Sequence, residues 1–181
     1  MRKLADQKRI AAFMRALSER ARDDSRLYFT GGATAVLLGW RATTIDVDIL
    51  LVPDEDTLRA VPELKDRLQV NVELACPADF IPPLPGWEDR SLYIERQGKL
   101  SFFHYDLYAQ CLAKIERDHA QDRLDVQEMI RRGLVEPAML LELLAKIEPN
   151  LYRYPAIDPA SFRRSVEAIV ADLSGAGSAF D

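Results

Sequence analysis

The sequence predicts an α/β (α+β) protein, with a short mixed β-sheet and flanking helices followed by a C-terminal helical portion. Three observations predict this class. Short apolar runs with strand-like alternation lie in the first half of the chain, stretches with helix-like spacing separate them, and from residue 106 to about residue 173 the spacing is helical. We therefore expect an α/β core over residues 1–105, helices packed on it over residues 106–174, and a frayed tail over residues 175–181.

The first helix and the first strand are indicated by their apolar residues. Over residues 3–22, apolar side chains recur at helix-like intervals among Arg and Lys, which predicts a helix that packs on the core. Residues 27–29 form a short apolar run that predicts a strand, and residues 33–38 predict a short helix. The chain therefore passes from a strand into a helix over residues 30–32.

A glycine pair, Gly31-Gly32, lies at this transition. Glycine lets a backbone approach a ligand closely, and the helix start that follows offers unpaired N–H groups and a positive dipole to an anion. Thr30 and Thr34 add hydroxyl donors. Most glycine pairs only form turns, so the phosphate site predicted here depends on the residues that follow.

Two aspartates, Asp46 and Asp48, share one face of the next predicted strand, because strand side chains alternate between faces. Ile45, Val47 and Ile49 form the opposite, apolar face. Two carboxylates on a half-buried surface repel each other and lose hydration. A solvated edge strand would tolerate them, but after a glycine pair they indicate a site for Mg²⁺, which takes carboxylate oxygens together with phosphate and water.

The segments on either side of the aspartate strand also carry information. Arg41 precedes the strand, where it can bind a phosphate or a base, or pair with the aspartates when no metal is bound. Pro53 ends the strand. The acidic residues 54–56 begin a helix that extends to about residue 68, and Pro62 interrupts or restarts it.

The following strand supplies a third acid. Val70, Val72 and Leu74 alternate with Asn71 and Glu73, so the predicted strand has one apolar and one polar face. If this strand neighbours the aspartate strand, Glu73 completes a three-carboxylate site. In two-metal phosphoryl chemistry, two ions about 3.5–4 Å apart clamp the attacking and leaving oxygens. An exposed strand residue without a role is the alternative for Glu73.

Residues 77–91 are rich in proline, which excludes a regular helix or ladder and predicts a loop. Asp79 in this loop is the rival third acid. Apolar side chains indicate that the loop is ordered, namely Phe80, Ile81, Leu84 and Trp87. After the loop, residues 91–95 and 100–105 flank Gln97-Gly98-Lys99 and predict a β-hairpin.

The helical portion carries charged residues at helix spacing. Lys114 and Arg117 lie three apart and can reach one point in space, and Asp122 and Asp125 share the first face of a helix that residues 118–121 begin as a capping box. Two cations near a carboxylate-metal cluster would suit a triphosphate. Ion pairs within one helix are the alternative. Further along, Gly133 predicts a helix stop and Glu136-Pro137 the next start.

Composition limits the classes of function. The 181 residues are 48% hydrophobic and 29% charged, enough for one core with a small helical addition, and the net charge of −5 excludes a global basic field that would hold a long nucleic acid. No signal-peptide core and no membrane-length apolar run is present, so we expect a cytoplasmic protein without membrane contact. The two cysteines and two histidines, Cys76, Cys111, His104 and His119, have neither disulfide-framework nor zinc spacing.

Together these residues resemble the nucleotidyltransferases of the DNA polymerase β superfamily. The fuller pattern resembles a bacterial group of nucleotidyltransferases related to the AbiEii-type toxins of abortive-infection and toxin–antitoxin systems, and the likeness to that group spans nearly the whole chain. The pattern consists of Gly31-Gly32, Arg41-x-Thr43-x-x-Asp46-x-Asp48, the Pro77 to Arg90 loop, Lys114-x-x-Arg117, Gln121-Asp122-x-x-Asp125 and Leu151 to Pro155.

The resemblance implies a nucleotidyltransferase fold and a Mg²⁺-dependent transfer, with two ions during catalysis, of a nucleoside monophosphate from a nucleoside triphosphate to a hydroxyl acceptor. The acceptor is an RNA or tRNA end or a protein, and an antitoxin is an implied partner. Two alternatives stay open: a catalytically quiet nucleotide-binding or antitoxin-like module, and a transferase that modifies antibiotics. The expected catalytic residues are Asp46, Asp48, Glu73, Lys114 and Asp122, with Asp46, Asp48 and Glu73 on metal and Gly31, Gly32, Thr34, Arg41, Lys114 and Arg117 on the nucleotide.

Overall fold

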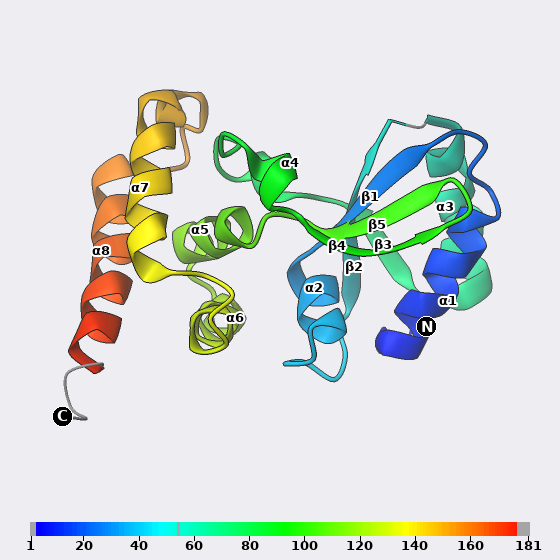
Figure 1. The fold of residues 1–181 in the computed structure, drawn as a ribbon, viewed down its shortest axis with the longest axis horizontal. Helices are drawn as coiled ribbons and strands as arrows, with labels where there is room; N and C mark the ends of the chain where they lie inside the picture. The colour runs from blue at the N-terminus through cyan, green and yellow to red at the C-terminus, as the bar shows by residue number, and fades with distance from the viewer. Residues whose placement is uncertain (1–2, 54, 177–181) are drawn as a thin grey trace. The chain divides into compact units, whose positions relative to one another are not determined.

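The structure, a computed structural model, describes residues 3–53 and 55–176 (Figure 1). The chain divides into two compact units. The sheet unit comprises Met1–Cys76 and Arg90–Tyr105, and the helical unit comprises Pro77–Asp89 and Asp106–Asp181. Of the tail predicted over residues 175–181, residues 175 and 176 close the last helix, and the remainder lies outside the described residues.

The sheet unit contains the predicted mixed sheet, with five strands in the order β3-β2-β1-β5-β4. The β1–β5 and β2–β3 pairs are parallel, and the β1–β2 and β4–β5 pairs are antiparallel. Because β2 runs antiparallel to β1, the last residues of β1 and the first residues of β2 lie at the same end of these two strands. The strands are β1 Ser25–Thr30, β2 Asp46–Val52, β3 Asn71–Leu74, β4 Leu92–Gln97 and β5 Leu100–His104.

One face of the sheet packs into the hydrophobic core together with α1 Gln7–Ser18, α2 Gly31–Leu37 and α3 Glu55–Leu68. Phe29, Ile49 and Phe102 contribute from the strands and are almost fully buried. Since strand side chains alternate, the residues between them point to the other face. That second face, which we call the acid-bearing face, includes Asp46 and Asp48.

Several local details differ from the predictions. The first helix is shorter than residues 3–22, because the carboxylate of Asp6 caps it by accepting from the N–H of Arg9 (2.9 Å), and Ala5 instead pairs with Thr44. Pro62 does not interrupt α3, which is continuous. Leu74, which alternation places on the apolar face with Val72, is 63% exposed at the end of an edge strand.

The hairpin prediction is confirmed by β4 and β5, which are joined through Gly98 at φ +58°. The proline-rich loop contains a short 3₁₀ helix, η1 Pro77–Asp79, and a single helical turn, α4 Trp87–Arg90. Of its four apolar anchors, Ile81 and Leu84 are buried. The loop is therefore ordered mainly by two aliphatic side chains.

The helical unit has the predicted sequence of helices, and Gly133 (φ +68°) follows α6 while Pro137 opens α7. The predicted capping box at residues 118–121 is wrong. Asp118 is the left-handed C-cap of α5 (φ 54°), and His119 precedes α6 without a side-chain cap. In the described part of the chain, every helix is too short or too polar to cross a membrane. The elements are α5 Leu107–Arg117, α6 Ala120–Arg131, α7 Pro137–Ile147, η2 Glu148–Arg153 and α8 Pro159–Ala176.

Candidate active site

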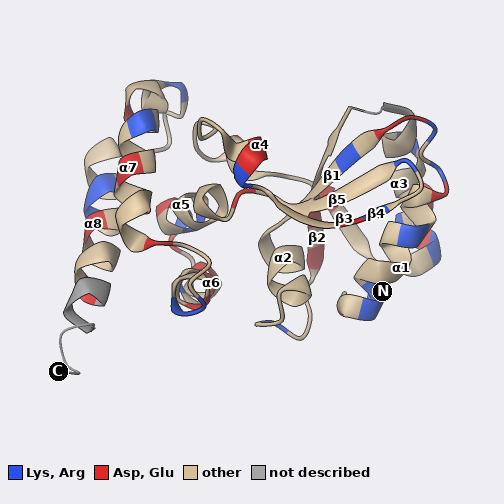
Figure 2. Ribbon diagram, in the orientation of Figure 1, with Lys and Arg blue, Asp and Glu red and all other residues tan. Residues whose placement is uncertain are grey.

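The two aspartates lie at the start of β2 on the acid-bearing face, and both are partly exposed. Strand register brings Glu73 beside them. In the parallel β2–β3 pair, Asp48 is the partner of Glu73, and Asp46 is the partner of Asn71. On its other side Asp48 is the partner of Thr30, the last residue of β1. The three predicted acids therefore lie on adjacent strands at one edge of the sheet, and Figure 2 shows acidic positions on β2 near the uncharged helix α2.

Asn71 is a member of this group that the sequence did not indicate. Its side-chain amide donates to Oδ1 of Asp46 (2.5 Å) and to Oε1 of Glu73 (3.1 Å). It thus joins two carboxylates on neighbouring strands. In the sequence, the only indication of its role was its position two residues before Glu73 on the same polar face. The pairing of β2 with β3 brings that position next to Asp46.

Neighbouring side chains leave no room for a Cβ atom at either residue of the glycine pair. Gly31 has φ +55°, and a Cβ atom at this position would lie 2.7 Å from Oδ2 of Asp48. A Cβ atom on Gly32 would overlap the side chain of Thr44 and lie 3.3 Å from a guanidinium nitrogen of Arg41. The glycine backbone therefore runs directly beside an aspartate carboxylate and an arginine.

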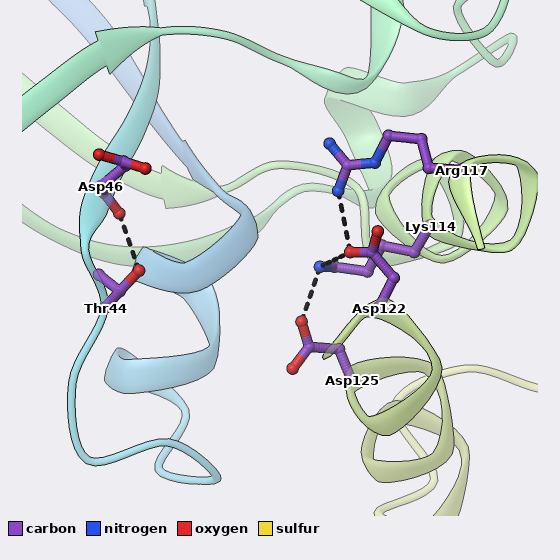
Figure 3. A network of polar contacts seen from close by, with 6 residues as sticks. All are labelled: Thr44, Asp46, Lys114, Arg117, Asp122 and Asp125. Carbon is purple, nitrogen blue, oxygen red and sulfur yellow. Dashed lines mark hydrogen bonds and ion pairs between the residues drawn. The ribbon is translucent and has the colours of Figure 1, made fainter. Parts of the chain in front are cut away.

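Thr44 and Thr34 both have structural hydrogen bonds. The Thr44 hydroxyl donates to the backbone carbonyl of Asp46 (3.0 Å; Figure 3). The Thr34 hydroxyl is fully buried and donates its proton to the carbonyl of Phe29 (3.0 Å). As it lies, Thr34 cannot donate to a phosphate, because this turn of α2 faces the interior. The expected nucleotide contact of Thr34 stays a prediction, and in this structure the hydroxyl is bound to the protein interior.

His104 ends β5 and contacts the same threonine. Its Nδ1 lies 3.3 Å from the Thr34 hydroxyl oxygen. The direction of this hydrogen bond depends on the tautomer of the imidazole ring. Burial lowers the pKa of His104 to about 4, so the ring is neutral at pH 7. His104 thus connects the end of β5 to α2, the helix that the glycine pair begins.

The predicted cations of the helical unit form a buried network between two helices (Figure 3). Nζ of Lys114 donates to Oδ1 of Asp122 (2.9 Å) and to Oδ2 of Asp125 (2.7 Å), and Nη2 of Arg117 donates to Oδ1 of Asp122 (2.9 Å). The side chains of Lys114, Asp122 and Asp125 are 5%, 7% and 0% exposed. The pairs join α5 to α6, so they are not ion pairs within one helix.

Opposing effects set the charge state of Asp122. Burial acts to raise the pKa of Asp122, but Lys114 and Arg117 outweigh it and hold that pKa below its usual range. Among the described residues, Oδ2 of Asp122 and Nε of Arg117 are buried without a hydrogen-bond partner. The guanidinium of Arg117 also lies over the ring of Phe80, 4.6 Å from its centroid.

The structure therefore collects the predicted site residues in two groups, one in each unit. The sheet unit holds Gly31, Gly32 and Arg41 with the three acids, and the helical unit holds Lys114 and Arg117 with Asp122. Asp125 joins the second group as a residue that the expected set omitted. Asp79, the rival third acid, is an exposed residue of η1 in the helical unit and has no strand position beside Asp48. Within residues 3–53 and 55–176, no three His, Cys, Asp or Glu side chains gather as a ready-made metal site.

Comparison with known proteins adds one finding. No curated protein and no solved structure matches the chain. Residues 6–158, which include every residue of both groups, match the model of a family described as "Nucleotidyltransferase of unknown function (DUF6036)". The chain therefore belongs to this family of nucleotidyltransferases.

Proposed function

We propose that the protein catalyses Mg²⁺-dependent transfer of a nucleoside monophosphate from a nucleoside triphosphate to a hydroxyl acceptor. The acceptor hydroxyl gives up its proton to Glu73 or to water, its oxygen bonds to the α-phosphorus, the bond from that phosphorus to the bridging oxygen breaks, and pyrophosphate leaves. One observation carries the proposal: the strand register sets Asp48 beside Glu73 on one face, directly against the backbone of the glycine pair.

The donor set of the sheet unit fits Mg²⁺. Asp46, Asp48 and Glu73 supply hard carboxylate oxygens from adjacent strands, and Mg²⁺ in phosphoryl-transfer sites is commonly held by one or two carboxylates together with substrate phosphates and water. Divalent ions supply Lewis-acid stabilisation of the charge on phosphoryl oxygens. The two aspartates are the assigned ligands, and Glu73, the most exposed of the three acids, assists at the acceptor hydroxyl.

The nucleotide phosphates bind beside the glycine pair in this proposal. Gly31 and Gly32 leave no side chain between the backbone and Asp48, and the guanidinium of Arg41 lies next to Gly32. Backbone N–H groups and an arginine are suitable donors to phosphate oxygens. We assign Thr34 no direct phosphate contact in this proposal, because its hydroxyl donates to the carbonyl of Phe29.

The sequence resemblance assigns Lys114 and Arg117 to the triphosphate, and we keep that assignment as part of the proposal. Arg117 is the more accessible of the two, with 30% of its side chain exposed, so we assign it the direct contact. Lys114 donates to both Asp122 and Asp125, and these three residues hold the cationic end of α5 in a fixed arrangement. Asp122 then acts on the nucleotide through the orientation of Arg117.

The test is pyrophosphate release from each of the four ribonucleoside triphosphates, with Mg²⁺ and with EDTA, in the presence of total cell extract as the acceptor source. Wild type, Asp46→Asn, Asp48→Asn and Glu73→Gln are compared with Glu95→Gln, an exposed acid of β4 in the same sheet. We expect the aspartate variants to lose at least about 100-fold in rate and Glu95→Gln to match wild type. Equal rates in wild type and Asp48→Asn would refute the proposal.

The same experiment separates the alternatives. Triphosphate binding without Mg²⁺-dependent release would indicate a quiet nucleotide-binding or antitoxin-like module. With an α-labelled triphosphate, label in RNA, in protein or in a small molecule identifies the acceptor class, and label on an added antibiotic would indicate an antibiotic-modifying enzyme.

We further propose a toxin-like role in the manner of the AbiEii-type proteins, with an antitoxin as partner. The support is the spacing of Lys114, Arg117, Asp122 and Asp125, which resembles the motifs of those toxins. Induced expression of wild type in a bacterial host should arrest growth, whereas Asp48→Asn at equal protein level should not. Equal growth of both strains would refute the role in toxicity and leave the transfer reaction untouched.

A further inference from the structure

The acid-bearing face of the sheet carries aromatic side chains that no part of the proposed chemistry uses. In strand register, Tyr28 of β1 is the partner of Phe103 of β5, and Phe103 is the partner of Tyr93 of β4. The three residues thus form a row across adjacent strands, which we call the aromatic row. Tyr28 precedes Thr30 by two residues, and Thr30 is the partner of Asp48, so the aromatic row shares a face with the acids.

The rings of the aromatic row support one another. Phe103 stacks on Tyr28 with centroids 5.2 Å apart and an interplanar angle of 27°, and Tyr93 meets Phe103 edge to face at 5.6 Å and 71°. Exposure rises outward along the row: Tyr28 is 2% exposed, Phe103 is partly exposed, and Tyr93 is 62% exposed. Tyr93 therefore exposes a large part of its ring to solvent, while Phe103 packs against the ring from the inner side.

A row of arginines follows on the same face. Arg26 precedes Tyr28 by two residues and is the partner of Ser101, which is also the partner of Arg96. Arg96 is bound to Asp24 (2.6 Å), whereas Arg26 is exposed and makes no ion pair within the described residues. Rows two residues apart along a strand are separated by about 7 Å. Along β1 the rows therefore pass through Thr30, the partner of Asp48, then Tyr28 and then Arg26, while Tyr93 lies on β4, at the opposite edge of the sheet from β3.

We infer that Tyr93 and Phe103 form a stacking site for an unpaired base of a single-stranded nucleic acid whose terminal hydroxyl lies at the acids. The inference rests on the proposed function and names the acceptor class. Sheet-mounted aromatic rings are a common platform for unpaired bases, and cations beside the rings bind the backbone. A single strand that crosses the face from β2 to β4 would place its end at Asp48 and a base on Tyr93, and Arg26 on the intervening strand β1 can bind a phosphate, whereas a protein or small-molecule acceptor would not need all three rows.

The experiment measures binding alone, by fluorescence anisotropy of a short fluorescein-labelled single-stranded RNA, without nucleotide or Mg²⁺. Tyr93→Ala should weaken binding about tenfold, the order expected for one lost stacking contact. Tyr93→Phe keeps the ring and should bind like wild type. Arg26→Ala should reduce the slope of log Kd against log salt by about one. Tyr152→Ala is the matched control, because Tyr152 is 73% exposed in the helical unit, and it should leave binding unchanged.

Equal affinity of Tyr93→Ala and wild type would overturn the inference, and so would an equal loss in Tyr152→Ala or an equally tight complex with blunt duplex RNA. Thermal unfolding of each variant checks that the fold is retained. Asp48→Asn separates this inference from the proposed function, because it should abolish transfer but still bind RNA. If Tyr93→Ala binds normally while Asp48→Asn lacks transfer, the inference fails and the proposed function stands.

Discussion

The two units hold their acidic residues in opposite ways. In the helical unit, Asp122 and Asp125 are buried and each accepts from a cation. In the sheet unit, Asp46 is partly exposed and Glu73 is exposed, both accept from the neutral amide of Asn71, and neither makes an ion pair within the described residues. The protein thus supplies a countercharge for Asp122 and Asp125 and a neutral donor for Asp46 and Glu73.

Because of this difference, we expect substitutions in the two acid groups to affect different properties, stability in one and activity in the other. Removing one partner from a buried, charge-balanced pair leaves the other charge uncompensated in a low-dielectric interior, which costs folding free energy. Removing a carboxylate that lies in a partly solvated row, close to another carboxylate, costs little and relieves repulsion. We therefore expect substitutions in the helical network to act first on stability, and substitutions in the sheet acids to act on the reaction.

The largest effect is expected for Lys114→Met. It removes the ammonium but keeps the packing of the stem, so buried Asp122 keeps only Arg117 and buried Asp125 loses Lys114, and the free energy of unfolding should fall by about 3–5 kcal/mol. Urea denaturation followed by circular dichroism measures it. The exposed Arg123–Asp118 pair is the control, and Arg123→Ala should cause no measurable change. Adding Asp122→Asn and Asp125→Asn to Lys114→Met should recover part of the loss, and no recovery would contradict the charge argument.

The next effect concerns His104 and pH. Because the pKa of His104 is about 4 in the folded state and about 6.5 in the unfolded chain, the unfolded chain takes up a proton first as the pH falls. The free energy of unfolding should thus decrease from pH 6.5 to pH 4, by about 3 kcal/mol in total. Urea denaturation at several pH values should show this slope in wild type and a smaller one in His104→Gln. Parallel curves would mean that His104 does not titrate in this window.

Much of the sheet unit could be predicted from local patterns. Alternation of apolar residues predicted β2 and the β4–β5 hairpin, and the glycine pair and Asp46-x-Asp48 were found by spacing alone. These features are local because side-chain faces and turns depend on neighbouring residues. Asn71 could not be found in this way, since its contact with Asp46 depends on which strands pair and in which register.

The helical network shows the same limit. Helix spacing predicted that Asp122 and Asp125 share a face, but their partner lies on another helix, and the approach of α5 to α6 is set by packing. The capping box at Asp118 failed for a related reason. The left-handed C-cap of α5 occupies that residue, and its carboxylate pairs with Arg123 instead.

A smaller effect is expected from alanine at the glycine turn. Gly31 and Gly39 both have positive φ, at +55° and +87°, so alanine at either position should cost about 1–3 kcal/mol in backbone strain. Only Gly31 has a carboxylate oxygen within 2.7 Å of the added Cβ, whereas Gly39 has nothing within 4 Å. Gly31→Ala should therefore abolish pyrophosphate release and Gly39→Ala should retain it. Equal activity of the two variants would mean that the backbone beside Asp48 is not part of the site.

The smallest effect on stability is expected for Asp46→Asn. This substitution tests most directly whether the acids of the sheet unit differ from those of the helical unit. The substitution keeps the shape of the side chain and removes one of the neighbouring negative charges, so the free energy of unfolding should stay within about 0.5 kcal/mol of wild type. Asp125→Asn is the matched change in the helical unit and should be clearly destabilising, because it weakens the hold on buried Lys114. If Asp46→Asn unfolds as easily as Asp125→Asn, the sheet acids contribute to the fold as the helical acids do. Loss of transfer could then no longer be assigned to the chemistry of Asp46, and Asp48→Asn would have to carry the assignment alone.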